Sequence, residues 1–171
     1  MMRYTTTNAV ITDLQTIYRL FDEAILFQKN NNYIGWSNYD KQYIAADVER
    51  GLLFKMVAGT NVICIFSICY SDPLIWRDRE KGDAVYLHRI VLNQQYKGEK
   101  VFEKVLAWTL ELARQKKLGY IRMDTWAENA KIIGYYKSYG FRFVENYTTP
   151  DTDELPVQHR NLNVALLELS L

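Results

Sequence analysis

A short turn between a strand and a helix carries the features of an anion-binding site. The turn has the sequence NQQYKGEK, residues 93–100, and follows the strand-like run AVYLHRIVL. The first N–H groups of a helix lack partners within the helix, and the helix dipole adds partial positive charge there. Lys97 and Lys100 add full charges, so a diphosphate would fit this turn. The alternative is an ordinary loop with one turn glycine and two solvated lysines.

The segment AENAKIIGYYKSYGF, residues 127–141, places polar groups at helical spacing. Asn129 stands at the start of the predicted helix, and Tyr136 follows seven residues later, so both lie on nearly the same face. A phenol has a pKa near 10 and stays protonated at neutral pH, so it can donate a proton. Tyr135 is expected to be a packing residue, and Gly140 with Phe141 to turn the helix into the next strand. The alternative is that both tyrosines are core aromatics.

His88 is the natural candidate for accepting a proton near neutral pH. On a strand, Tyr86, His88 and Ile90 share one face. Asp124 lies near the end of the neighbouring strand YIRMDTW and could orient the imidazole or a substrate ammonium. The alternative is a partly buried histidine in a structural hydrogen bond. His159, in the stretch ELPVQHRN, is expected to be solvated.

The hydrophobic pattern predicts the elements that would position these residues. The run GTN between two β-rich stretches indicates a hairpin, and 71–83 is expected to be a loop. The predicted fold class is α/β with a mixed (α+β) sheet, in which an antiparallel meander is followed by a β-α-β-α-β-β unit. Helices are predicted over 13–29, 40–50, 99–117 and 128–139, and strands over 2–7, 52–59, 62–70, 84–93, 120–126, 141–147 and 161–169.

Composition is typical of an ordinary globular protein. The 171 residues suit a single domain over 1–171, and the net charge of +1 gives no strong overall field toward nucleic acid or an anionic membrane. Cys64 and Cys69 would face opposite sides of a strand and are expected to be reduced thiols rather than a disulfide or metal site. No secretory signal and no run of the ~20 apolar residues that span a bilayer is found. We therefore expect a cytoplasmic protein without a metal.

The turn, the β-α-β-α-β order and the spacing of Asn129, Tyr136 and Gly140-Phe141 resemble the GNAT superfamily of acyl-CoA-dependent N-acetyltransferases. The family pattern Q/R-x-x-G-x-G/A binds the coenzyme A pyrophosphate through backbone N–H groups. A slipped register over 95–100 keeps the Gln and the first Gly, but the YKG lead-in favours a later start. In the favoured register the six positions are Lys97, Gly98, Glu99, Lys100, Val101 and Phe102, with Lys100 and Phe102 in place of the glycines.

The resemblance implies direct transfer of an acetyl group, in a ternary complex, from acetyl-CoA to a primary amine of a small molecule or peptide. Tyr136 would protonate the departing thiolate, His88 would act as the base, and Asn129 would contact the cofactor. The thioester carbonyl would be polarised by backbone N–H groups near Ile90, Val91 and Leu92. The expected acceptor-contacting residues are Tyr33, Trp36, Tyr86, Asp124 and Trp126.

Two other functions fit parts of the sequence. A non-catalytic acyl-CoA-binding or regulatory module on the same fold would explain the missing glycines, because side chains there restrict close backbone approach. An unrelated α/β interaction domain would explain the order of elements but not the spacing of Asn129, Tyr136 and Gly140-Phe141. A monomer or homodimer is expected, with an amine as partner and neither nucleic acid nor a membrane.

Overall fold

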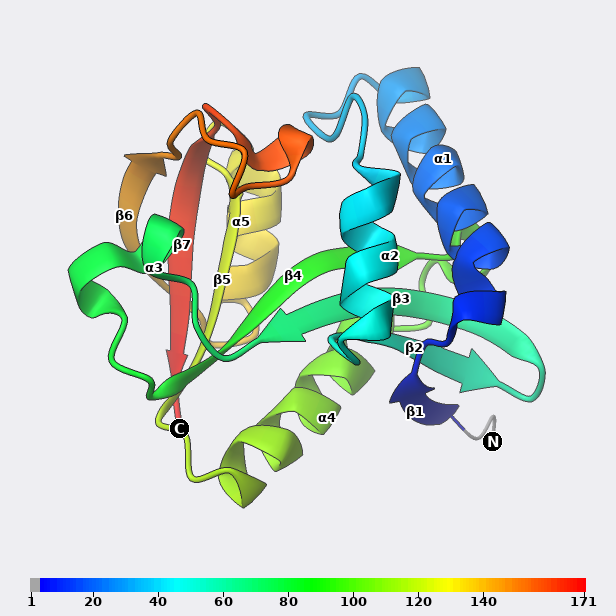
Figure 1. Ribbon diagram of the computed structural model, residues 1–171, viewed down its shortest axis with the longest axis horizontal. Helices are drawn as coiled ribbons and strands as arrows, with labels where there is room; N and C mark the ends of the chain where they lie inside the picture. Colours follow the sequence, from blue (N-terminus) through cyan, green and yellow to red (C-terminus); the bar gives the residue numbers. More distant parts are fainter. Residues whose placement is uncertain (1–3) are drawn as a thin grey trace. The chain divides into compact units, whose positions relative to one another are not determined.

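The structure, a computed structural model that describes residues 4–171, is built on a seven-stranded mixed sheet (Figure 1). The strand order is β1-β2-β3-β4-β5-β7-β6, which confirms the predicted mixed class with its antiparallel meander. The predicted first strand begins at Met2, outside the described residues. The strands are β1 (Tyr4–Asn8), β2 (Leu53–Ala58), β3 (Asn61–Cys69), β4 (Ala84–Leu92), β5 (Tyr120–Trp126), β6 (Arg142–Thr148) and β7 (Asn163–Ser170).

Five α-helices and four short 3-10 turns connect these strands within the described residues. Each long helix lies within a few residues of its predicted bounds. The α-helices are α1 (Leu14–Asn30), α2 (Lys41–Glu49), α3 (Pro73–Trp76), α4 (Val101–Gln115) and α5 (Ala130–Lys137), and the 3-10 turns are η1 (Ile11–Asp13), η2 (Arg77–Arg79), η3 (Gln94–Tyr96) and η4 (Val157–His159). No helix in the described part of the chain combines the length and the apolar character that a membrane crossing requires.

Contacts divide the chain into two compact units. The first contains the described residues up to 68 together with 89–108, and the second contains 69–88 and 109–171. Both β4 and α4 therefore contribute residues to each unit.

The first unit packs helices on the meander of β1, β2 and β3 (Figure 1). The apolar stripe of α1 is buried at helical spacing against β2 and β3, as the sequence predicted. Successive strand residues face opposite sides, so Leu53 joins this core while Phe54 packs on Trp108 of α4, with ring centroids 4.7 Å apart. Asp40 caps α2 by accepting a hydrogen bond from the Tyr43 N–H at 3.0 Å.

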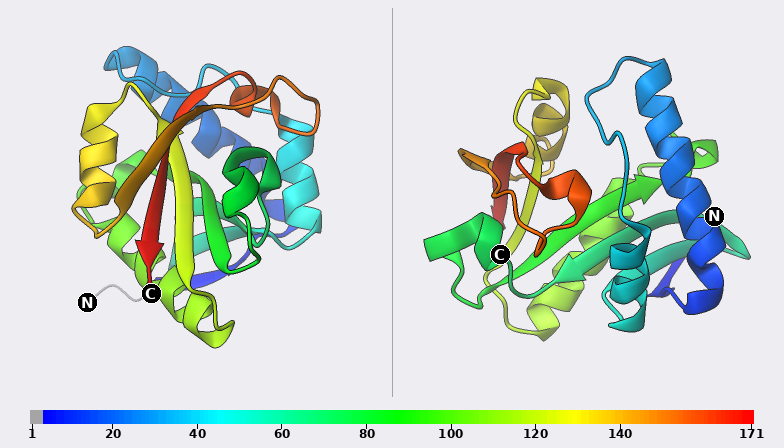
Figure 2. Two further views of the ribbon diagram at one scale, coloured as in Figure 1. Left: turned by 90° about the vertical axis from the view of Figure 1, so that its left-hand side faces the viewer. Right: turned by 45° about the horizontal axis from the view of Figure 1, so that its top comes forward.

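The second unit combines one parallel and two antiparallel pairings. The residues Ala84–Leu87 of β4 pair in parallel with Tyr120–Met123 of β5. β7 is antiparallel to both of its neighbours and lies between β5 and β6 (Figure 2). Its core includes Trp76 and Tyr86, both fully buried.

The segment 71–83, predicted to be a loop, instead contains α3 and η2. Pro73 occupies the first turn of α3, where its missing N–H costs nothing. Trp76 then inserts into the core and anchors the segment. Four helical residues are too few for a hydrophobic period to appear in the sequence, which explains the difference.

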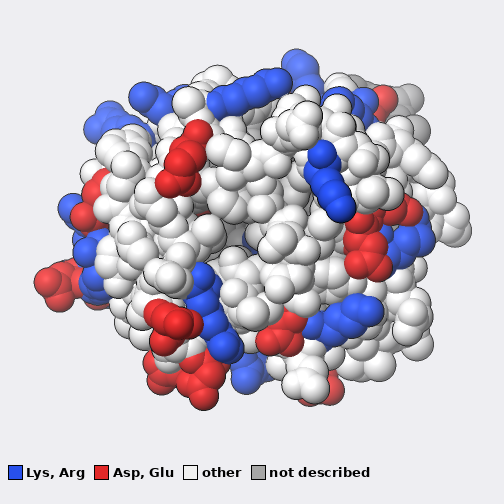
Figure 3. Space-filling view, turned by 90° about the horizontal axis from the view of Figure 1, so that it is seen from above, with Lys and Arg blue, Asp and Glu red and all other residues white. Residues whose placement is uncertain are grey.

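Charged side chains of both signs are interspersed on the face shown in Figure 3, with uncharged residues between them. Neither sign dominates this face, in keeping with the net charge of +1. The view gives no extended basic patch of the kind that binds nucleic acid.

Candidate active site

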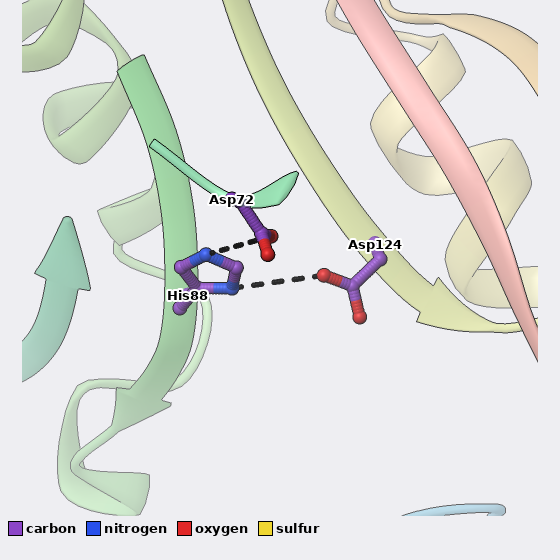
Figure 4. A group of neighbouring side chains, drawn as sticks. All are labelled: Asp72, His88 and Asp124. Atoms are coloured by element: carbon purple, nitrogen blue, oxygen red, sulfur yellow. Dashed lines mark ion pairs between the residues drawn. The ribbon is translucent and has the colours of Figure 1, made fainter. Parts of the chain in front are cut away.

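His88 lies between two carboxylates in the second unit (Figure 4). Its Nε2 is 3.5 Å from Oδ2 of Asp72, and its Nδ1 is 3.6 Å from Oδ1 of Asp124. All three side chains are nearly buried, at 10–11% exposure. The sequence had suggested the pair of His88 and Asp124, whereas Asp72 was not foreseen.

The register of two parallel strands brings His88 and Asp124 together. Leu87 of β4 is paired with Met123 of β5, and His88 and Asp124 are the next residues on each strand. Residues at equivalent positions of adjacent strands point to the same face of a sheet. Both side chains therefore leave the sheet on one face where the paired segment ends.

Asp72 is positioned by the carboxylate of Glu80, which accepts hydrogen bonds from the backbone N–H groups of Asp72 and Gly82; we call this arrangement the Glu80 clamp. The Asp72 N–H donates to Oε2 of Glu80 at 2.7 Å, and the Gly82 N–H donates to Oε1 of the same carboxylate at 2.8 Å. Burial by itself raises the pKa of Glu80, but hydrogen bonds from Tyr86 and from these two N–H groups outweigh it, so the pKa lies below its usual value. Glu80 is thus held as a carboxylate that fixes the backbone of Asp72.

Arg122 connects this clamp to the sheet. Its Nη1 donates to the Tyr86 hydroxyl at 3.1 Å and its Nε to Glu168 at 2.7 Å. The guanidinium also lies 4.9 Å from the centre of the Trp76 ring, a cation–π contact. Tyr86, which we expected to contact the acceptor, is fully buried, and its hydroxyl is engaged by Arg122 and Glu80. An acceptor role for Tyr86 stays a prediction that its burial does not favour.

His159 was expected to be solvated, and that expectation is wrong. The side chain lies in η4 and is only 9% exposed, with its ring centroid 6.4 Å from that of His88. The loop folds back because Thr149 Oγ1 donates to the His159 carbonyl at 2.6 Å and accepts from the Leu162 N–H at 2.9 Å. His88 and His159 are far apart along the chain, so their contact leaves no local sequence pattern.

Helix α5 carries Asn129 and Tyr136, also in the second unit. Asn129 is the N-cap, and its Oδ1 accepts a hydrogen bond from the Ile132 N–H at 3.1 Å. Tyr136 is half-buried, with its ring centroid 6.4 Å from that of Phe141. Tyr135 is 41% exposed and its ring lies 5.2 Å from that of Tyr139 between centroids, so its expected role as a packing residue stays a prediction. The two tyrosines are about 100° apart around the helix, and Tyr136 is the more buried of the two.

The turn before α4 belongs to the first unit and is built on Asn93. The Asn93 side chain donates to the Val62 carbonyl at 2.9 Å and accepts from the Gln95 N–H at 3.1 Å. Two residues of the predicted pyrophosphate motif have left-handed backbone, Gly98 with φ of 94° and Lys100 with φ of 50°. Lys100 thus occupies a conformation that favours glycine, at the position where the family pattern has glycine.

The side chains of the predicted pyrophosphate motif differ in exposure. Lys97, Glu99 and Lys100 are exposed, so their side chains are accessible to a ligand. The side chains of Val101 and Phe102 are buried, which leaves their backbone as the part that could contact an anion. The lysine ammonium groups and the N–H groups at the start of α4 together can hold a phosphate.

The backbone of β4 is irregular at Arg89, the residue after His88. Arg89 has φ of 50°, a left-handed value inside a strand. Ile90, Val91 and Leu92, predicted to polarise a thioester carbonyl, follow this residue. Their location immediately after the irregularity fits backbone N–H groups that turn out of a regular ladder.

The aromatic residues predicted to contact the acceptor belong to different units. Tyr33 and Trp36 lie in the first unit and pack on α1, where Trp36 is 5.4 Å from Phe21 between ring centroids. Trp126 is half-buried and ends β5 in the second unit.

The Asp72–His88–Asp124 cluster can accept a proton and hold a cation. Opposite charges close to an imidazole stabilise its protonated form, and a histidine that accepts a proton is a typical general base. One ligand atom from each of the three side chains lies within 4.8 Å of the others, a spacing that can hold a cation.

The chain is similar to known acetyltransferases. Residues 15–141 match the model described as the acetyltransferase (GNAT) family. The curated relative "Uncharacterized N-acetyltransferase YesJ" of Bacillus subtilis (strain 168) is 21% identical over 144 residues, which cover 80% of each chain.

Solved structures show the same fold. A GNAT-family acetyltransferase from Listeria monocytogenes 4b F2365 has a TM-score of 0.80 at 19% identity, covering 99% of this chain and 96% of that chain. The PaiA N-acetyltransferase from Thermoplasma acidophilum, in complex with coenzyme A, has a TM-score of 0.71 at 16% identity, covering 99% and 100%.

Proposed function

The chain belongs to the acetyltransferase (GNAT) family, and we propose that it moves the acetyl group of acetyl-CoA to the primary amine of a small molecule or peptide. The observation that carries the proposal is His88, nearly buried between two carboxylates at the point where β4 and β5 stop pairing. The similarity to an N-acetyltransferase solved with coenzyme A supports acetyl-CoA as the donor.

The coenzyme would be held by backbone and by charge. The N–H groups of the turn from Lys97 to Phe102 would bind its pyrophosphate, with the exposed ammonium groups of Lys97 and Lys100 nearby. N–H groups following Arg89 would polarise the thioester carbonyl. Asn129, whose side-chain oxygen caps α5, would contact the coenzyme.

The reaction requires two protons to leave the amine. An ammonium first gives one proton to His88 and becomes a neutral nucleophile. Its nitrogen then attacks the carbonyl carbon, a C–N bond forms, and the C–S bond breaks. Tyr136 donates a proton to the thiolate and recovers one from the nitrogen, so the products are an amide, free coenzyme A and a protonated His88 that loses its proton to solvent.

Acetyl transfer is tested by release of the coenzyme A thiol with a library of amines. His88→Gln should lower the rate about 10²–10⁴-fold near neutral pH, as expected for loss of a general base. His159→Gln is the matched control, because it removes the other histidine of the chain from a neighbouring, equally buried position. Equal loss in both variants would contradict a base role for His88.

Coenzyme binding without any transfer would instead favour the non-catalytic acyl-CoA-binding module. Lys100 and Phe102 in place of glycines favour that alternative, because side chains restrict close backbone approach. Thermal unfolding with acetyl-CoA, coenzyme A and ATP separates binding from chemistry. A ligand at 100 times its Kd should add about 2.7 kcal/mol to stability.

A further inference from the structure

We propose that Asp47 of α2 is a positioning residue for acetyl transfer, because through Arg89 it holds the irregular backbone of β4 that presents N–H groups to the thioester carbonyl. This role rests on the proposed acetyl transfer and assigns to it a residue that no sequence motif indicated. It is carried by the buried ion pair of Asp47 and Arg89, in which the arginine has left-handed backbone inside a strand. Both residues belong to the first unit.

Arg89 leaves the regular strand conformation just after β4 ceases to pair with β5. The parallel register runs from Ala84 to Leu87, and Arg89 follows two residues later with φ of 50°. A residue with a Cβ avoids this region of backbone space, so an arginine stays there only when its surroundings hold it. The contacts of the Arg89 side chain supply that support.

Helix α2 binds the Arg89 guanidinium through two side chains on one face. Asp47 forms the ion pair, in which both side chains are at most 6% exposed, and the centre of the Tyr43 ring lies 5.1 Å from the guanidinium. Tyr43 and Asp47 are four residues apart, so they are neighbours on the helix surface. The residues that follow each of them, Ile44 and Val48, are buried in the core of the first unit. The core therefore fixes the orientation from which α2 holds Arg89.

The N–H groups that follow Arg89 point alternately to the two edges of β4. The Val91 N–H donates a hydrogen bond to the Cys64 thiol of β3. Successive residues of a strand direct their backbone groups to opposite edges, so the N–H groups of Ile90 and Leu92 point away from β3. That is the edge on which the pairing with β5 has already ended. Of the three residues predicted to polarise the thioester, Ile90 and Leu92 are thus the two whose N–H groups suit its oxygen.

Fixed donors are what this chemistry requires. The carbonyl oxygen gains negative charge as the amine attacks, and donors that are already in place stabilise that charge without reorganising. Asp47 acts on these donors through the Arg89 side chain and backbone, so it positions the reacting groups without touching them. An ion pair that served stability alone would instead be replaceable by apolar side chains of similar volume.

A charge-free replacement separates positioning from stability. Arg89→Met alone leaves Asp47 buried without its cation and should destabilise the fold. The double variant Asp47→Leu with Arg89→Met removes both charges, which usually restores stability, and urea unfolding checks that it does. With an amine that the library identifies, its kcat should still be roughly 10²-fold below wild type while KM changes little, because the donors act in the transition state. Recovery of kcat together with stability would overturn the proposal.

The carbonyl band of bound acetyl-CoA gives a readout that stability does not move. Isotope-edited infrared spectroscopy, with the label at the acetyl carbonyl, measures polarisation without any acceptor. Wild type should shift the band to a lower wavenumber than in free acetyl-CoA, and the double variant should lose most of that shift. Lys55→Met, which breaks the partly buried pair of Lys55 and Asp13 in the same unit, should keep both the shift and kcat. No shift in wild type, or an equal shift in the double variant, would overturn the proposal.

The two readouts also separate this proposal from the proposed function. A polarised carbonyl in wild type that is lost in the double variant, without acetylation of any amine, would retain the role of Asp47 at the thioester and overturn acetyl transfer. Acetylation by wild type with an undiminished kcat in the double variant would retain the function and overturn the positioning role.

Discussion

Arg89 forms an ion pair with Asp47 of α2, and both side chains are at most 6% exposed. The Arg89 guanidinium also lies 5.1 Å from the centre of the Tyr43 ring on the same helix. Arg89 has left-handed backbone, which costs about 1–2 kcal/mol for a residue other than glycine. The buried pair therefore fixes an unfavourable backbone conformation at the residue that follows His88.

Removing one partner of this pair should destabilise the fold strongly. Arg89→Met leaves Asp47 buried without its cation, which typically costs about 3–5 kcal/mol. The free energy of unfolding in urea measures the loss. Arg19→Met, which breaks the exposed pair of Arg19 and Glu23, should cost no more than about 1 kcal/mol. Similar losses in the two variants would show that the buried pair has no special role.

Lys100 offers a test of the predicted pyrophosphate turn. Lys100→Gly and Lys100→Ala remove the same charge, but only glycine also removes the Cβ that disfavours φ of 50°. The glycine variant should be about 1 kcal/mol more stable than the alanine variant. It should also bind coenzyme A more tightly, as measured by calorimetry. Weaker binding in the glycine variant would place the pyrophosphate elsewhere.

The Tyr136 hydroxyl should matter for acetyl transfer and little for stability. Tyr136→Phe keeps the ring and its contact with Phe141, so the melting temperature and coenzyme affinity should change little. The transfer rate should fall, because the thiolate loses its acid. Tyr135→Phe is the control on the exposed face and should be nearly silent. An inactive Tyr135 variant beside an active Tyr136 variant would mean that the other face of α5 meets the coenzyme.

Glu80 should make stability depend on pH. Its pKa in the folded protein lies below the ordinary value of 4.5, so its contribution is present above that pH and is lost as the pH falls through the folded pKa. The stability advantage of wild type over Glu80→Gln should therefore be full at pH 7 and shrink below 4.5. Urea unfolding across this range measures it. Glu111→Gln, at an exposed position of α4, is the control. A difference between wild type and Glu80→Gln that is the same at pH 3 and pH 7 would refute the clamp.

The two cysteine thiols should differ in reactivity. Cys64 is fully buried, and burial raises its pKa to about 12, so it should resist a disulfide reagent at pH 8 in the folded protein. Cys69 is only half-buried and should react first. Titration of native and unfolded protein counts the thiols, with Cys64→Ser to assign them. Rapid modification of Cys64 in the native protein would contradict its burial.

The sequence predicted the long elements because their signals are local. Strand alternation in YIRMDTW and the helical stripe of α1 depend only on neighbouring residues, and both elements formed close to their predicted bounds. The short α3 gave no such signal. The expectation that 1–171 forms a single domain stays a prediction.

The candidate site was only partly predictable, for a related reason. His88 and Asp124 could be matched because they occupy adjacent strands. Asp72 reaches His88 only through the Glu80 clamp and the burial of Trp76, which are contacts that no spacing in the sequence encodes. His159 likewise lies beside His88, with ring centroids 6.4 Å apart, although the two residues are far apart along the chain.

The position of β7 bears on how this protein is made. β7 separates β5 from β6, yet it follows both in the chain. During synthesis β5 and β6 leave the ribosome first, and the strand that must lie between them arrives last. Until it does, each presents an unpaired edge, which is the kind of surface that joins to another chain. The second unit can therefore finish folding only after the codons for β7 have been translated, and nascent chains held before that point should depend most on chaperones.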